Sequence, residues 1–534
     1  MKTMAVPLVE GAWRFRRGFW RKVSALLVAC FCFGCFTGWV LAGAALAAFS
    51  FQNVTEKAAK LAQKDYEDPP RVPDFLANIN YDAFRDIRFD PEKALWKKEK
   101  LPFTLQFFHP GFNYLHPVKI HTVEGQQVAD VPFSSDFFSY GRNDFKDRIP
   151  ADVGYAGLRV HYPVKTPEYL DEIIVFLGAS YFRAVGRNHQ YGISARGLAI
   201  DTGSSPGEEF PAFTEFWIVR PLPAATQLTV YALLDSPRIT GAYAFVIKPG
   251  VEMTIKVRSR LFLRKKINKI GIAPLTSMYF YGENTVGVPD DFRPEVHDSD
   301  GLLVGFRSGE WLWRPLVNPK GLMIYSFDAP DPVGFGLLQR DQNFDHYQDL
   351  EARYDIRPSV QISPAGKWGP GRVELLEIPS PNELNDNITA YWVPENVPGP
   401  GNPLVLDYTM SWHSPDGSQP PGGRVVSTRT AVGASPKSRI FVIDFAGRDL
   451  EAMPPDKPLT AVVTTDERSP LLEQQLFKNR VTGGWRLVFQ IQLPEPGSLS
   501  ALLPDRRRPL ELRAFLKGTN NNVLTETWSY AFEP

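Results

Sequence analysis

The sequence predicts an all-β protein, with a large N-terminal β-sandwich followed by a smaller immunoglobulin-like β-sandwich. Three observations support this fold class. Runs of β-branched and aromatic residues alternate with polar ones, as in Met253–Leu263, where Met253, Ile255 and Val257 point to one side. Glycine and proline together make up about 16% of the chain, against an average near 12%, so turns are frequent. A proline-rich segment, 393–403, divides the chain.

The composition is that of an ordinary folded protein. Hydrophobic residues make up 43% of the 534 residues and charged residues 22%, which argues against wholesale disorder. The 59 basic residues equal the 59 acidic ones, whereas a nucleic-acid-binding domain usually carries a basic excess. We therefore expect no nucleic acid among the partners.

Residues 1–47 are predicted to be an export signal. A stretch rich in arginine and lysine precedes Ala25–Ala47, which carries no charge. The stretch Arg16–Arg21 resembles a twin-arginine signal, and Ala45–Ala47 matches a cleavage site with small residues. The predicted location of the protein is therefore the periplasm.

Two other interpretations of this segment stay open. At about 23 residues the apolar run is long enough to cross a bilayer, so the first alternative is an uncleaved membrane anchor. The second is a lipoprotein box, which Leu27–Cys30 resembles. All three cysteines, Cys30, Cys32 and Cys35, lie in the run. Cleavage after Ala47 would therefore leave a mature chain with no disulfide and no thiolate nucleophile.

Residues 48–392 are predicted to form the large domain. It opens with a short helix near Thr55–Tyr66 and a proline-rich turn at Pro69–Pro73. Strand-like runs follow from about Pro102, separated by turns such as Asp235–Arg238. The clearest of these runs are Glu172–Leu177, Phe216–Val219, Leu228–Leu234, Ala242–Ile247 and Met253–Leu263. Their spacing suggests a large antiparallel sandwich.

The proline-rich segment 393–403 is predicted to be a linker between domains. Its four prolines, in the sequence VPENVPGPGNP, favour an extended conformation. Residues 404–534 then form the predicted immunoglobulin-like domain. Its strands are expected at Leu404–Trp412, Ile440–Phe445, Leu459–Thr464, Gly484–Gln492 and Val523–Ala531.

The common catalytic motifs are absent from the sequence. It lacks a phosphate-binding GxxxxGK[ST] loop, a GxGxxG fingerprint after a strand, a GxSxG elbow and an HExxH zinc motif. None of the eight histidines has a histidine partner four residues later, so no metal site is predicted. We also expect no cofactor.

Short segments of the sequence combine carboxylates, arginines and aromatic rings. They are Ser180–Arg196, His297–Gly301, Gly309–Pro315, Arg353–Pro358 and Glu383–Trp392. Aromatic faces match the apolar faces of sugar rings, and polar side chains match the hydroxyls at the ring edge. Two carboxylates on separate loops could hydrolyse a glycosidic bond, one as general acid and the other as general base. The same residues could instead be structural, with the aspartates in turns and the indoles in the core.

At these segments the chain resembles the periplasmic glucan biosynthesis proteins G and D. The resemblance runs from about Phe103 to Trp528. The matches that carry it are GASYFRA at 178–184, YGISARGLAIDT at 191–202, EFWIVRP at 215–221, LLDSP at 233–237, APLTSM at 273–278, GFGLLQR at 334–340 and ETWSY at 526–530. It implies a galactose-mutarotase-like supersandwich with a sugar-binding cleft, followed by the immunoglobulin-like domain.

The resemblance also implies action on β-1,2-glucan, the backbone of osmoregulated periplasmic glucans. The family includes anomer-inverting endo-β-1,2-glucanases, whose general acid corresponds to Asp386 and whose general base corresponds to Asp298. Asp300 is a second acid in the same loop as Asp298. Residue type and segment suggest sugar-binding roles for Arg183, Tyr191, Asp300, Trp311, Trp313, Tyr354, Arg357 and Trp392.

Two other functions stay open. The chain could be a non-catalytic glucan-binding factor that assists an inner-membrane glucosyltransferase in elongation, branching or release. A mutarotase-like enzyme acting on free sugars shares the sandwich type, but it would need a histidine acid beside a glutamate base. Only His297 lies near the acid cluster, so this function ranks last. The resemblance further implies a homodimer.

Overall fold

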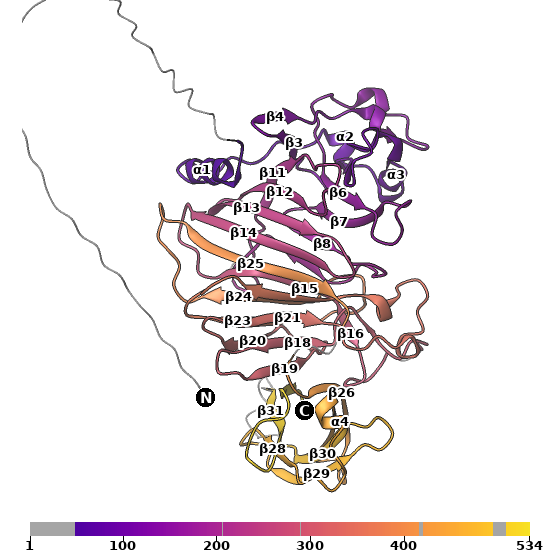
Figure 1. The fold of residues 1–534 in the computed structure, drawn as a ribbon, viewed down its shortest axis with the longest axis vertical. Helices are drawn as coiled ribbons and strands as arrows, with labels where there is room; N and C mark the ends of the chain where they lie inside the picture. The colour runs from indigo at the N-terminus through magenta and orange to yellow at the C-terminus, as the bar shows by residue number, and fades with distance from the viewer. Residues whose placement is uncertain (1–47, 206, 289, 416–419, 495–508) are drawn as a thin grey trace, which may run out of the picture. The chain divides into compact units, whose positions relative to one another are not determined.

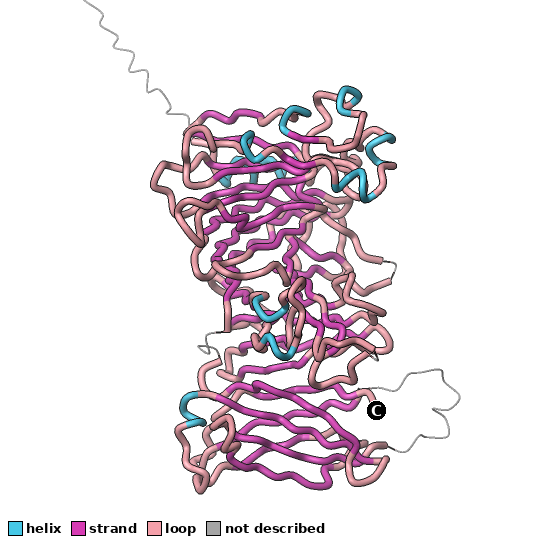
Figure 2. Tube along the Cα trace, turned by 90° about the vertical axis from the view of Figure 1, so that its right-hand side faces the viewer, coloured by secondary structure: helices cyan, strands magenta, loops and turns pink. Residues whose placement is uncertain are grey.

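The computed structural model describes residues 48–205, 207–288, 290–415, 420–494 and 509–534. The predicted export signal lies outside these residues. β-Strands dominate the described chain, and its helices are short (Figure 2). No helix in the described ranges is long and apolar enough to cross a membrane. The all-β sandwich class predicted from the sequence is confirmed.

Two large sheets form the main sandwich. Among the described residues, the first sheet contains, in spatial order, β2 (Thr104–Phe108), β6 (Gly157–Tyr162), β7 (Asp171–Leu177), β8 (Tyr181–Ala184), β9 (Ser194–Arg196), β15 (Ile270–Ser277), β24 (Ile388–Pro394), β23 (Gly371–Glu377) and β20 (Met323–Asp328), with β10 (Leu198–Ile200) paired to β15. Most neighbours are antiparallel, as the alternating runs predicted.

The second sheet runs from the N-terminal strands to the C-terminal ones. Its spatial order is β28 (Thr460–Thr464), β31 (Leu510–Lys517), β32 (Thr527–Phe532), β19 (Trp311–Pro315), β18 (Gly301–Gly305), β21 (Gly334–Leu338), β22 (Ser359–Pro364), β25 (Leu404–His413), β14 (Met253–Leu263), β13 (Ile239–Lys248), β12 (Leu228–Asp235), β11 (Ala212–Val219), β3 (Lys119–Glu124) and β4 (Gln127–Asp130). Figure 1 shows β13, β14 and β25 side by side in this sheet.

The remaining elements are smaller. A four-stranded sheet contains β26 (Arg424–Val432), β27 (Ser438–Ala446), β30 (Trp485–Gln492) and β29 (Leu471–Lys478). Two short ladders pair β1 (Arg88–Phe89) with β5 (Phe138–Ser139), and β16 (Tyr279–Tyr281) with β17 (Val296–His297). The α-helices are α1 (Phe51–Leu61), α2 (Asp74–Ala77), α3 (Tyr81–Arg85) and α4 (Arg448–Glu451), and the 3-10 helices are η1 (Pro91–Lys93), η2 (Ser135–Phe137), η3 (Lys146–Arg148), η4 (Phe344–His346) and η5 (Tyr354–Ile356).

The main hydrophobic core lies between the two large sheets. Phe176 of β7 meets Phe245 of β13 edge to face, with ring centroids 5.3 Å apart. The ring centroids of Phe182 in β8 and Trp412 in β25 lie 6.2 Å apart, with the two rings tilted relative to each other. All four rings are buried in one continuous cluster. These contacts hold the first sheet tightly against the second.

The strand Leu404–His413 departs from the expected domain boundary. It does not begin the C-terminal sandwich, because β25 pairs with β14 on one side and β22 on the other. Its buried residues Leu406, Tyr408 and Met410 join the main core. The proline-rich segment 393–403 therefore connects β24 in one layer to β25 in the other. Proline suits such a crossover as well as it suits a linker, because neither needs backbone donors.

Helix α1 covers the outer face of the second sheet. Neighbouring residues of β13 point in opposite directions, so Phe245 enters the main core while Ala244 faces the helix. Phe51 and Val54 of α1 are buried against this outer face. The helix starts earlier than the predicted Thr55, because the side chain of Asn53 accepts a hydrogen bond from the Ser50 amide at 2.8 Å and caps the first turn.

The C-terminal strands form a smaller sandwich that shares a sheet with the large one. A second core lies between β26, β27 and β30 on one side and β31 and β32 on the other. Strand β32 pairs in parallel with β19, so the second large sheet continues into the smaller sandwich. Main-chain hydrogen bonds between β19 and β32, and not a flexible linker, therefore connect the large sandwich to the small one.

A buried ion pair also bridges this joint. Arg340 makes two hydrogen bonds to Glu526, at 2.6 and 3.0 Å, and both side chains are nearly inaccessible to water. Glu526 also accepts a hydrogen bond from the Val425 amide at 2.7 Å. The single carboxylate therefore satisfies donors from two separate segments, which makes it costly to remove.

We expect Glu526→Gln to lower the free energy of unfolding by about 2–3 kcal/mol, since a buried charged hydrogen-bond network loses its acceptor charge. Urea denaturation would measure the change. The matched control is Glu310→Gln, which breaks the more exposed pair with Arg513 and should cost less than about 1 kcal/mol. Equal losses in the two variants would contradict the assignment of Glu526 as the more important contact.

Candidate functional site

A polar cleft of about 500 Å³ opens beside the first sheet. Strands β7, β8 and β9 supply one wall. The rest comes from the segments just before β3, β9, β16 and β22, the segment just after β17, and the loop between β23 and β24. The cleft is lined by Tyr114, Val175, Leu177, Tyr181, Phe182, Arg183, Tyr191, Gly192, Ser194, Met278, Asp298, Tyr354, Arg357, Glu383, Leu384, Asn385 and Asp386. Six of the residues proposed from the sequence meet here, from segments far apart in the chain.

Asp298 follows strand β17 and points into the cleft. Its amide donates to the carbonyl of Met278 at 2.8 Å, which fixes the loop against the end of β16. The carboxylate is buried and forms an ion pair with Arg357. Burial raises the pKa of Asp298 to about 6, and the charge of Asp386 adds to this rise, whereas Arg357 opposes it.

Asp386 reaches the same cleft from the loop between β23 and β24. The next residue, Asn387, anchors this loop: its side chain accepts from the Tyr279 amide at 2.8 Å and donates to the Tyr279 carbonyl at 2.9 Å. Asp386 itself is accessible to solvent but surrounded by the cleft walls. The loss of hydration there raises its pKa, while Arg183 and Arg196 lower it.

Arginine–aromatic pairs line the cleft around these two acids. The guanidinium of Arg357 lies 4.4 Å from the ring centre of Tyr354, and that of Arg183 lies 5.6 Å from Tyr191. These pairs hold the cations in fixed orientations. The cleft thus offers planar faces, fixed cations and carboxylates together, which suits a hydroxyl-rich ring.

The comparison with protein families identifies the chain. A family model described as "Periplasmic glucan biosynthesis protein, MdoG" matches residues 49–532. The chain belongs to this family. The glucans biosynthesis protein G of Ralstonia nicotianae is 46% identical to it over 499 residues, covering 91% of this chain and 96% of the relative. Proteins of the same name from Pseudomonas paraeruginosa and Pseudomonas aeruginosa are each 44% identical over 495 residues, covering 90% of this chain and 92% of the relative.

Membership of the MdoG family confirms the resemblance inferred from the sequence. It also establishes a role in glucan biosynthesis, in the terms of the family description. The motifs GASYFRA and YGISARG, which carried the resemblance, contain β8, β9 and the residues just before β9, and they bring Tyr181, Arg183, Tyr191 and Ser194 to the cleft. Two of the segments that carry the resemblance to the family therefore form a wall of the cleft.

Four residues that the sequence analysis assigned to sugar binding lie elsewhere. Trp392 is fully buried in the main core, where its indole donates to the carbonyl of Ala329 at 3.0 Å. Trp311 and Trp313 are buried in the second core, against the C-terminal strands. Their burial favours the structural alternative for all three indoles. Trp313 also lines a small pocket that is separate from the cleft.

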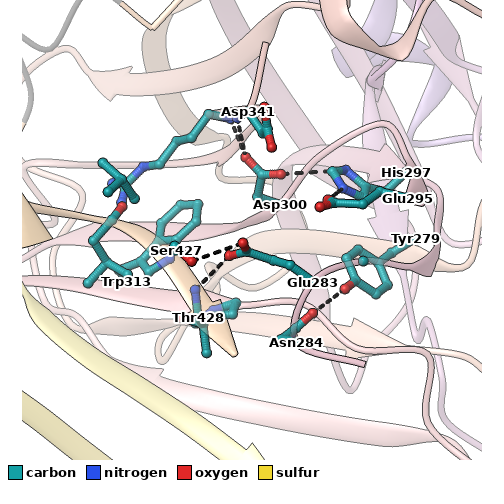
Figure 3. Close-up of a pocket in the computed structure, with 15 residues that line it drawn as sticks. Tyr279, Glu283, Asn284, Glu295, His297, Asp300, Trp313, Asp341, Ser427 and Thr428 are labelled. Atoms are coloured by element: carbon teal, nitrogen blue, oxygen red, sulfur yellow. Dashed lines mark hydrogen bonds and ion pairs between the residues drawn. The ribbon is translucent and has the colours of Figure 1, made fainter. Parts of the chain in front are cut away.

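Asp300 also lies outside the cleft, in a separate small pocket shown in Figure 3. Its carboxylate accepts hydrogen bonds from the amides of Arg340 and Asp341 and lies 3.5 Å from His297. His297 is held on its other side by Glu295 at 2.9 Å. Since Asp298 lies between His297 and Asp300 in sequence, this network secures both ends of the loop that carries Asp298.

One group near this pocket has the residue types of a metal site. Ligand atoms of Glu295, Asp341 and His346 all lie within 4.8 Å of one another. Each already has a protein partner, because Glu295 bonds to His297, and Asp341 bonds to His346. Protein partners thus already contact ligand atoms of all three residues.

Several residues of the cleft were not predicted from the sequence. Tyr181 and Ser194 lie within the segments that carried the resemblance, and Glu383 lies in the segment around Asp386, so a closer reading could have found them. Tyr114 is different. It comes from a loop that no motif singled out, and only the folded chain brings it to the cleft.

Proposed function

We propose that this MdoG-family protein acts in the periplasm as an anomer-inverting endo-β-1,2-glucanase of glucan biosynthesis. The observation that supports this proposal best is the meeting of Asp298 and Asp386, from two separately anchored loops, in one cleft. Burial raises the pKa of both carboxyls, while the guanidinium of Arg357 favours the ionised form of Asp298.

The proposed reaction assigns one proton transfer to each acid. Asp386 is the general acid: its protonated form, which burial favours by raising the pKa, gives its proton to the oxygen that links two glucose units. Asp298, held ionised by Arg357, accepts a proton from the attacking water, directly or through a hydroxyl. The bond from the anomeric carbon to the linking oxygen breaks as the bond to the water oxygen forms, so the anomeric configuration inverts.

The direct test is to incubate the protein with linear β-1,2-glucan and measure new reducing ends. We expect slow cleavage, with products that NMR shows to have the inverted anomeric configuration at first. Products of retained configuration would contradict the inverting mechanism. Binding of the glucan without cleavage would contradict the hydrolase altogether.

The activity should depend on pH in a bell-shaped manner. Asp298 must be ionised to act as base, so kcat/KM should rise as the pH passes through about 6. Asp386 must be protonated, so the activity should fall as this carboxyl loses its proton, at a pH above that at which an ordinary aspartate does so. A pH series of initial rates measures both limbs. An acidic limb near the ordinary aspartate pKa of about 4 would contradict the role of Asp298.

A second candidate function is a non-catalytic one, favoured by the name of the relatives, which refers to biosynthesis and not to hydrolysis. The same cleft would then hold a nascent glucan for an inner-membrane glucosyltransferase. This function predicts that calorimetry detects binding of β-1,2-glucan while the reducing-end assay detects no cleavage.

A further inference from the structure

A second chamber, of about 250 Å³, lies beside the cleft. Tyr114 lines both spaces. Leu177 and Tyr181 line the cleft, while the two residues that follow Leu177, Gly178 and Ala179, line the chamber. The two spaces are therefore neighbours on opposite sides of one short turn and one tyrosine ring.

The chamber carries an exposed aromatic face. Phe210 is 56% exposed and lines the chamber together with Tyr66 and Tyr114. Polar groups from Asn113, His116 and Thr214 complete the wall. An exposed phenylalanine by itself is common, but this one stands at the edge of a concave space that adjoins a polar cleft.

Two ion pairs hold the segment that carries Phe210. The preceding residues Glu208 and Glu209 bind the guanidinium groups of Arg196 and Arg238 respectively. The Glu209 amide also donates to the carbonyl of Ile200 at 3.1 Å. The exposed ring is thus presented by a fixed backbone.

A row of planar groups connects the chamber to the cleft. The guanidinium of Arg196 lies 4.5 Å from the ring centre of Tyr181, which lines the cleft, and 5.7 Å from that of Phe210, which lines the chamber. Arg196 also influences the pKa of Asp386. The row Tyr181–Arg196–Phe210 therefore leads away from the proposed acid into the chamber.

We infer that the chamber is a distal subsite for the glucan chain, with Phe210 stacking on a glucose ring beyond those held in the cleft. This inference rests on the proposed function, because it needs the glucan to occupy the cleft. A chain that leaves the cleft past Tyr114 meets the apolar face of Phe210, while the chamber's polar groups meet its hydroxyls. The subsite makes long chains better ligands than short ones.

The test compares linear β-1,2-gluco-oligosaccharides of increasing length, by calorimetry, on the full chain and its variants. Phe210→Ala should weaken binding of long chains by about three- to tenfold, as expected for one lost aromatic contact, and leave the shortest binding oligosaccharide unaffected. Asn113→Trp, which crowds the chamber from an exposed loop, should act in the same way. The control is Phe477→Ala, which removes an exposed ring from β29 and should change neither affinity.

The outcomes separate this inference from the proposed function. If the unaltered protein binds none of the oligosaccharides, the proposed function fails, and the inference fails with it. If the unaltered protein binds long chains, but Phe210→Ala and Asn113→Trp leave the length dependence as it was, only the distal subsite is overturned. Equal weakening of short and long chains by either variant would also overturn it, because the chamber would then not be distal.

Discussion

Replacing Asp386 by asparagine is expected to lower kcat for β-1,2-glucan hydrolysis by about 10²–10⁴-fold, the usual contribution of a general acid. Asparagine has the same shape but carries no acidic proton, so the linking oxygen would have to leave unprotonated. Since Asn387 holds the loop independently of the Asp386 carboxyl, the variant should fold normally and still bind glucan. Reducing-end assays and calorimetry on the same preparation measure the two properties separately.

Asp144→Asn is the control for this variant, because Asp144 is exposed in a loop away from the cleft. It should keep full activity. Loss of binding together with activity in Asp386→Asn would assign the residue to substrate binding, and unchanged activity would remove it from the mechanism.

Replacing Trp392 by alanine is expected to lower the free energy of unfolding by about 3–5 kcal/mol. The indole is fully buried, lies 5.1 Å from the ring of Trp368, and packs so closely on Gly371 that a side chain there would collide with it. The truncation would leave a cavity and an unpaired carbonyl at Ala329. Urea denaturation measures the loss of stability.

Trp392→Phe provides the comparison, since it keeps most of the buried ring and should destabilise the protein less. At a temperature where both variants are folded, glucan affinity should match that of the unaltered protein. A variant with normal stability and weak glucan binding would return Trp392 to the sugar site that the sequence suggested.

The strands were the most predictable part of this fold. Met253–Leu263 has the bounds predicted for it, because its alternation is regular and turns flank it on both sides. The function of the segment 393–403 was not predictable in the same way. Its composition specifies an extended backbone. Whether that backbone joins two domains or two layers of one sandwich depends on which strands pair with Leu404–His413. Those strands, β14 and β22, are distant from it in sequence.

The resemblance located the two acids, whereas residue type located some of the cationic and aromatic residues of the cleft and misplaced the tryptophans. Asp298, Asp386, Arg183 and Arg357 were proposed from segments and meet in one cleft. The tryptophans were proposed because aromatic rings bind sugars, but a ring in a strand packs equally well in a core. Local sequence does not show which face of a sheet is covered, so the two cases look alike before folding.

The pairing of β19 with β32 has a consequence for the synthesis of the protein. Arg314 of β19 and Ser529 of β32 are hydrogen-bonded although 215 positions separate them. At ordinary translation speeds the ribosome needs roughly 10–40 seconds to make the intervening chain. During that interval β19, with Trp311 and Trp313, is an uncovered sheet edge that can pair with a neighbouring chain. This edge therefore stays open to mispairing until β32 has been made.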